Sequence, residues 1–87
     1  MSRESDVWAT PPEFFEKLKE VFRIDRDVCA LPFNAKCDRF WTPEDDGLKQ
    51  DWEGVCFMNP PFSETELWVQ KSVDSAMNGA VVIALLP

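Results

Sequence analysis

The residues with the clearest chemical potential are Asn59-Pro60-Pro61-Phe62, which follow the short apolar run Val55–Met58. This run is too short for a helix and lies between Gly54 and two prolines, so it predicts a buried strand. The prolines fix φ, remove two backbone donors and hold Asn59 extended. We therefore expect Asn59 and Phe62 at the carboxyl tip of this strand, where open parallel sheets bind their ligands.

An amide and an aromatic ring at such a tip suit the binding of a planar heterocycle. The Asn59 side chain offers a carbonyl acceptor and an amide donor, which can pair with an exocyclic amino group. The Phe62 ring offers a face for stacking, and the Pro60 carbonyl is a candidate second acceptor. The alternative is purely structural, with the prolines ending the strand and Phe62 packing in the core.

Asn-Pro-Pro-Phe resembles the Asn/Asp-Pro-Pro-aromatic motif of amino methyltransferases, which use S-adenosylmethionine to methylate adenine N6 or cytosine N4 in DNA. Further segments follow in the order seen in the phage-type Dam DNA N6-adenine methyltransferases, so that the resemblance covers nearly the whole chain. They are Trp8-Ala9-Thr10-Pro11-Pro12, Asp25-Arg26-Asp27-Val28-Cys29-Ala30, Asn34-Ala35-Lys36-Cys37, Asp46-Gly47-Leu48, Asp51-Trp52 and residues 81–87. The resemblance implies DNA as the partner and Asn59, Pro60, Pro61 and Phe62 as the catalytic residues acting on a flipped adenine.

The resemblance also implies an S-adenosylmethionine site. Its candidate residues are Trp8, Thr10, Pro11, Asp27, Cys29, Ala30 and Asp38. The first three belong to a Trp-x-Thr-Pro segment. Asp27 leads into Val28-Cys29-Ala30, which stands where other methyltransferases carry a Gly-rich turn, although this chain has no Gly-x-Gly. Asp38 resembles the acidic residue that holds ribose hydroxyls in Rossmann-like folds.

Each of these cofactor candidates also has a structural interpretation, which the sequence leaves open. Trp8 and Thr10 can form a hydrophobic staple and a helix cap. Asp27, like Asp25, can cap backbone groups or pair with Arg26. An exposed aspartate near a helix start, such as Asp38, needs no ligand.

The elements expected to position these residues alternate between helix and strand. A capping box from Thr10 to Glu13 and apolar residues at helical spacing predict a helix over about residues 11–22. Residues 24–30 predict a first strand, despite their charges. Ser63 with Glu66 predicts a second capped helix over about residues 63–78, stopped by Gly79. Its predicted buried stripe is Leu67, Trp68, Val73, Ala76 and Met77. Residues 80–86 predict an all-apolar strand buried on both faces.

The predicted fold class is α/β, a small two-layer or three-layer Rossmann-like parallel sheet of about three strands with flanking helices. Residues 1–87 then form a single domain that resembles part of a class I methyltransferase fold, whose complete form is nearer twice this length. The three strands match the first, fourth and fifth of that fold, which lie side by side. Both sheet edges are expected to be exposed or covered only by loops, which favours a homodimer. Phe40, Trp41, Leu48 and Trp52 are core or rim candidates, although Trp41 or Trp52 alternatively walls the cofactor adenine.

The charge of the chain points away from strong DNA binding. Sixteen acidic residues stand against nine basic ones, which leaves a net charge of −7. Affinity for duplex DNA comes from lysine and arginine, so this sign is unfavourable. The alternative function is an acidic phage inhibitor, derived from a methyltransferase fold, that mimics DNA toward a host nuclease in the manner of anti-CRISPR or anti-restriction proteins. Methyl transfer predicts a pocket joining Asp27, Asp38 and Asn59, whereas mimicry predicts carboxylates along one face.

Several classes of site are disfavoured by composition. The chain has no histidine, and its three cysteines, Cys29, Cys37 and Cys56, share no metal-ligand or redox spacing. We therefore expect no metal site. The apolar run near residue 80 is too short to span a membrane, and no signal peptide is evident. The expected location is the cytoplasm of a bacterial host, as a phage or prophage protein with reduced thiols.

Overall fold

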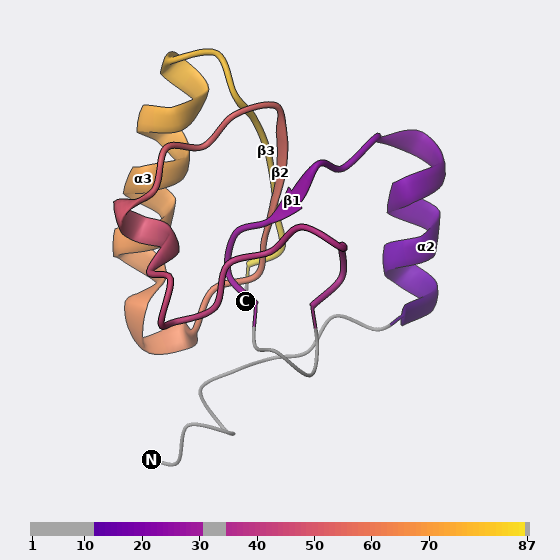
Figure 1. The fold of residues 1–87 in the computed structure, drawn as a ribbon, viewed down its shortest axis with the longest axis horizontal. Coiled ribbons are helices and arrows are strands. Elements are labelled where there is room, and N and C mark those ends of the chain that lie inside the picture. Colours follow the sequence, from indigo (N-terminus) through magenta and orange to yellow (C-terminus); the bar gives the residue numbers. More distant parts are fainter. Residues whose placement is uncertain (1–11, 31–34, 87) are drawn as a thin grey trace.

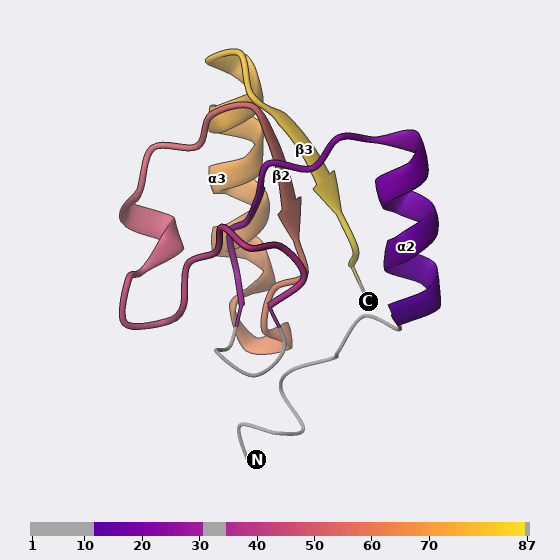
Figure 2. The same cartoon turned by 45° about the vertical axis from the view of Figure 1, so that its right-hand side comes forward.

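The structure is a computed structural model that describes residues 12–30 and 35–86. Three parallel strands, β1 (Arg26–Asp27), β2 (Val55–Met58) and β3 (Val81–Ala84), form one sheet in the order β1-β2-β3. The helices α2 (Pro12–Val21) and α3 (Thr65–Met77) lie on opposite sides of this sheet (Figures 1 and 2). The predicted α/β class with a small three-stranded parallel sheet is confirmed, with three layers.

The central strand β2 has the predicted bounds, and both of its faces are packed. Cys56 and Met58 belong to one core cluster with Val28, Trp52, Trp68 and Ala80. Phe57 points the other way, toward α2, where its ring meets Phe15 edge-on with the centroids 5.0 Å apart. Side chains alternate between the faces of a strand, so four apolar residues in a row supply both cores.

The first strand is shorter than the predicted range 24–30. Only Arg26 and Asp27 are in strand geometry, because consecutive charged residues have poor strand propensity. The ladder to β2 continues for one bond on each side, from the Asp25 amide to the Val55 carbonyl at 2.8 Å and from the Val28 amide to the Phe57 carbonyl at 3.0 Å.

The outer edge of β1 is covered by the loop that contains Arg39 and Trp41. The Asp27 amide donates to the Arg39 carbonyl at 3.0 Å, and the Trp41 amide donates to the Asp27 carbonyl at 3.0 Å. This confirms the expectation that a loop covers this edge, and it leaves the outer edge of β3 without a strand partner among the described residues.

The second helix begins later than predicted. A 3-10 turn, η2 (Phe62–Glu64), precedes it, and Glu64 stands at the capping position without a side-chain capping bond. The predicted start of the helix at Ser63 is therefore two residues too early, because the Pro61 carbonyl accepts the Glu64 amide at 3.1 Å and tightens this turn before α3 starts. The predicted stop at Gly79 is confirmed, since its φ of 103° ends the helix.

The buried face of α3 differs from the predicted stripe. Trp68 and Ser75 are buried, whereas Met77 is 82% exposed, and the other predicted members Leu67, Val73 and Ala76 are also exposed. The Trp68 ring lies 6.1 Å from that of Trp52, centroid to centroid. We infer that packing of this large ring sets the rotation of the helix, so the smaller apolar residues on other faces stay in solvent.

The third strand is less buried than predicted for residues 80–86. Val81–Ala84 form the strand, and none of these four residues is buried. The prediction of burial on both faces is wrong, because β3 is an edge strand and because α2, whose only buried residue is Phe15, covers little of the sheet beyond β2.

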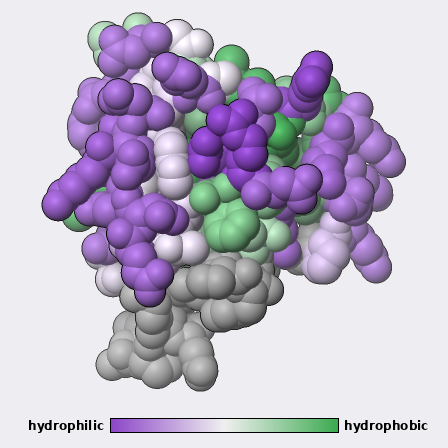
Figure 3. All heavy atoms as spheres, in the orientation of Figure 1, coloured by the Kyte–Doolittle hydropathy of each residue, from purple (hydrophilic) through white to green (hydrophobic). Residues whose placement is uncertain are grey.

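Figure 3 shows hydrophobic side chains gathered over the middle of one mainly hydrophilic face. Within residues 12–30 and 35–86, no helix has the length and apolar character needed to cross a bilayer.

Candidate active site

The carboxyl ends of the three strands meet at one edge of the sheet, because all of the strands are parallel. At this edge the chain leaves β2 through Asn59. The preceding residue, Met58, is fixed by the ladder, since its carbonyl accepts the Leu85 amide at 2.8 Å. Asn59 is thus the first residue beyond a rigid central strand.

The two prolines after Asn59 have different structural roles. Pro60 is fully buried and anchors the chain in the core. Pro61 has φ −59° and ψ 140°, which directs the chain into the 3-10 turn before α3. The two prolines restrict the backbone between Asn59 and Phe62, so both residues are held on a rigid support.

Phe62 is 40% exposed, so the alternative that it packs in the core is wrong. Its carbonyl accepts the Thr65 hydroxyl at 3.0 Å, which ties it to the first turn of α3. An exposed aromatic residue on a backbone held by the preceding prolines is suited to stacking against a planar base.

Asp27, at the end of β1, is a buried carboxylate that binds backbone amides. One oxygen accepts the Cys29 amide and the other accepts the Lys36 amide, both at 3.2 Å. Burial raises the pKa of Asp27, while these two bonds and the Lys36 charge oppose the rise. The capping interpretation of Asp27 is supported, and no ion pair joins it to Arg26 in the described part of the chain.

Because burial raises the pKa of Asp27 above its ordinary value of 3.8, the folded chain binds this proton more tightly than the unfolded chain. The resulting stability is fully present below the unfolded pKa and is lost as the pH rises through the folded pKa. We therefore expect the free energy of unfolding of the wild type, relative to that of Asp27→Asn, to increase as the pH falls from neutrality toward about 4. Urea unfolding of both proteins across this range measures it, and a constant difference would contradict the burial of a charged Asp27.

The other predicted cofactor residues divide into three groups. Trp8, Thr10 and Pro11 lie outside the described residues. Cys29 and Ala30 follow Asp27 at the strand edge, and the Ala30 amide donates to the Trp41 carbonyl at 2.9 Å. Asp38 is exposed. Burial and the charge of Asp27, followed by smaller charge effects that include Asp38, raise the pKa of the Cys37 thiol to about 11, so both carboxylates lie near this thiol.

Two features escaped the sequence prediction. Gly47 is buried against the Val28 carbonyl and the Trp68 ring, and its own carbonyl accepts the Trp52 indole N–H at 2.8 Å. A cleft of about 200 Å³ lies on the outer side of β1, where it does not join Asp27, Asp38 and Asn59. Its lining residues are Asp25, Arg26, Arg39, Trp41, Asp51, Glu53 and Gly54.

Neither the packing of Gly47 nor this cleft has a local sequence signal, because both depend on contacts between distant segments. Across the described ranges, no three Cys, Asp or Glu side chains are placed to hold a metal ion.

The sequence profile of the family described as DNA N-6-adenine-methyltransferase (Dam) matches residues 1–87. The chain belongs to this Dam family. A DNA N-6-adenine-methyltransferase of Haemophilus phage HP1 is 38% identical over 87 residues. The match covers 95% of this chain and 50% of that protein. One of Escherichia phage T1 is 29% identical over 85 residues, covering 94% of this chain and 36% of that protein. No solved structure matches the chain.

These comparisons confirm the resemblance inferred from the Asn-Pro-Pro-Phe segment and its flanking motifs. The chain spans half of the HP1 protein and about a third of the T1 protein, so it corresponds to only part of the curated Dam relatives that it matches. None of these matches supports the hypothesis of an acidic nuclease inhibitor.

Proposed function

We propose that this Dam family chain provides the adenine-binding edge of an S-adenosylmethionine-dependent DNA N6-adenine methyltransferase. The observation that carries the proposal is the exposure of Phe62, which follows Asn59 in the segment that leaves the tip of the central strand and is anchored by buried Pro60.

In this proposal the Asn59 carbonyl oxygen accepts a hydrogen bond from the adenine N6 amino group. That bond draws the amino hydrogens away and raises the electron density on nitrogen, which makes N6 a better nucleophile. Phe62 stacks on the flipped base, and the Pro60 carbonyl is the proposed second acceptor. Positioning of this kind needs no histidine, which the chain lacks.

The strand edge next to Asn59 is the proposed place for the cofactor, which when bound supplies an electrophilic methyl group. Both Asp27 oxygens are engaged with backbone amides, so its role would be to shape the loop rather than to contact the cofactor directly. We call these two hydrogen bonds the Asp27 clamp. In this proposal the clamp shapes the loop after β1, as a Gly-rich turn does in other methyltransferases. The proposed contacts are then the backbone of Cys29 and Ala30 and the exposed carboxylate of Asp38.

Calorimetric titration of the chain with S-adenosylmethionine tests this site. We expect saturable binding with a dissociation constant on the order of micromolar, a free energy of about −8 kcal/mol. Asp27→Ala should abolish the heat, because both clamped amides lose their acceptor, whereas Glu44→Ala, an exposed acidic residue elsewhere, should leave it unchanged. Circular dichroism of each variant establishes that it is folded.

The absence of heat at high ligand concentration would contradict a cofactor site in this chain. Binding that survives Asp27→Ala in a folded protein would retain the cofactor but contradict the proposed role of the Asp27 clamp.

A further inference from the structure

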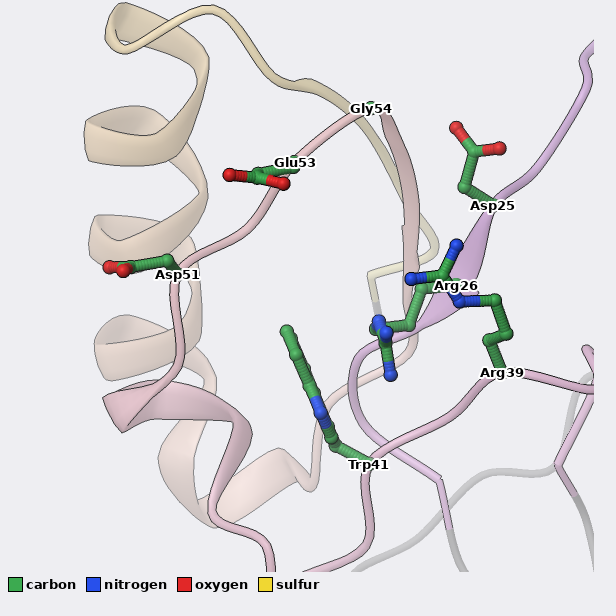
Figure 4. A pocket seen from close by; sticks show the side chains of 7 residues that line it. All are labelled: Asp25, Arg26, Arg39, Trp41, Asp51, Glu53 and Gly54. Carbon is green, nitrogen blue, oxygen red and sulfur yellow. The ribbon is translucent and has the colours of Figure 1, made fainter.

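Two of the four arginines of the chain, Arg26 and Arg39, line the cleft on the outer side of β1. They come from different segments, Arg26 from β1 and Arg39 from the loop that covers its edge. In the view of Figure 4 their guanidinium groups lie on the same side of the Trp41 ring. The fold therefore brings two of the chain's nine basic residues together in one cleft, which three acidic residues also line.

The Arg26 guanidinium is stacked on Trp41, with its central carbon 4.3 Å from the ring centroid. Stacking uses the face of the guanidinium and leaves the N–H groups in its plane free to donate elsewhere. The ring thus fixes the orientation of a planar donor fork, the geometry that recognises phosphate or carboxylate oxygens with two parallel hydrogen bonds.

Neither arginine has a carboxylate partner within 4.0 Å among residues 12–30 and 35–86. The ion pairs within 4.0 Å in the described ranges are Lys19 with Glu16 and Lys49 with Asp46. Asp25 also lines the cleft, but one of its oxygens accepts the Val55 amide at 2.8 Å. Two positive groups in one cleft without a close counter-ion are best stabilised by an anion with several acceptor oxygens.

The opposite wall of the cleft limits the size of that anion. Asp51 and Glu53 lie across the Trp41 ring from the arginines (Figure 4). Both are exposed, and they repel an extended track of negative charge. The cleft therefore suits one compact anionic group at the arginine side rather than a long stretch of polyanion.

We propose that this cleft binds a single phosphate group through Arg26 and Arg39. The phosphate is either one phosphodiester of the DNA substrate, which rests on the proposed function, or that of free phosphate or a mononucleotide. The site is separate from the edge that holds Asn59, because none of its lining residues follows the carboxyl end of β2.

Fluorescence anisotropy with a labelled single-stranded oligonucleotide, and NMR titration with inorganic phosphate and adenosine monophosphate, test the site. In Arg26→Gln/Arg39→Gln the planar amide at position 26 can still stack on Trp41. We expect phosphate binding to weaken at least about tenfold and, if DNA is the source, the slope of log affinity against log salt to fall by about 0.7, the value for one phosphate of a single strand. The matched control is Arg23→Gln, an exposed arginine outside the cleft, which should change the affinity by less than about twofold.

A variant that binds phosphate more tightly distinguishes the proposed phosphate site from a folding defect. Asp51→Asn/Glu53→Gln removes the repulsive wall, so phosphate binding should strengthen about fivefold. Glu20→Gln/Glu66→Gln makes the same change of net charge on the two helices and should have less than half of this effect in free energy.

Equal phosphate and oligonucleotide binding by the wild type and the double arginine variant would overturn the proposal. Loss of phosphate binding with unchanged oligonucleotide affinity and salt slope would support a site for free phosphate or a mononucleotide. Retained calorimetric binding of S-adenosylmethionine in the arginine variant shows that a failure here is independent of the proposed methyltransferase function.

Discussion

Replacement of Asn59 by alanine is expected to reduce methyl transfer to adenine by about 100-fold to 1,000-fold. The expectation rests on the proposed function, in which the Asn59 carbonyl is the group that polarises N6, and loss of one preorganised hydrogen bond to the reacting group costs about this much. Stability should change little, because Asn59 lies beyond the β2 ladder and the anchoring residue is buried Pro60. Transfer of labelled methyl groups from S-adenosylmethionine to DNA measures the effect.

Two further variants make this prediction specific. Asn59→Asp keeps a side-chain acceptor and matches the Asn/Asp alternative of the resembled motif, so it should recover part of the activity lost in Asn59→Ala. Phe62→Ala should chiefly weaken DNA binding, since base stacking contributes about 1–3 kcal/mol per base. Wild-type rates in Asn59→Ala would remove Asn59 from the proposed mechanism, whatever the result for Phe62.

Replacement of Gly47 by alanine is expected to destabilise the fold by about 3 kcal/mol, at the upper end of the usual cost of overpacking. A Cβ at this position would overlap the Val28 carbonyl oxygen and lie 3.0 Å from the Trp68 ring. The backbone cannot easily retreat, because the Gly47 carbonyl is held by the Trp52 indole. For a chain of this size the loss corresponds to a fall in Tm of about 12–24 °C, which differential scanning calorimetry measures.

Gly79→Ala is the matched control for this prediction. Gly79 has φ 103° and open space around its Cβ direction, so its substitution costs only backbone strain, about 1–2 kcal/mol. For Gly47 the cause is reversed, since its substitution by alanine destabilises the fold through steric overlap rather than backbone strain. A smaller loss of stability in Gly47→Ala than in Gly79→Ala would contradict the packing of Gly47 against the end of β1.

Local sequence features determined most of the secondary structure and the position of the proposed active edge. The bounds of β2 followed from four apolar residues between Gly54 and two prolines, and these prolines also placed Asn59 at the strand tip. Helix α2 and the stop of α3 at Gly79 were likewise predicted, because helical spacing and glycine conformation are properties of neighbouring residues. The Dam family was evident from the order of short motifs along the chain and was confirmed by the profile match.

Tertiary structure alone decided which of the apolar and charged residues are buried. Trp68 rather than Met77 faces the sheet from α3, because burial depends on the rings and glycine that meet the helix from other segments. β3 is exposed because it lies at the edge of the sheet, and its all-apolar sequence does not indicate that position.

The charged residues show the same division most clearly. Asp25, Arg26 and Asp27 are adjacent in the sequence, yet they cap the β2 backbone, stack on Trp41 and clamp the loop after β1, respectively. The partner of each group is at least nine residues away, apart from the nearby Cys29 amide that Asp27 also accepts. The sequence by itself thus determined the elements and the chemistry they carry, while long-range contacts decided the environment, and therefore the role, of each charge.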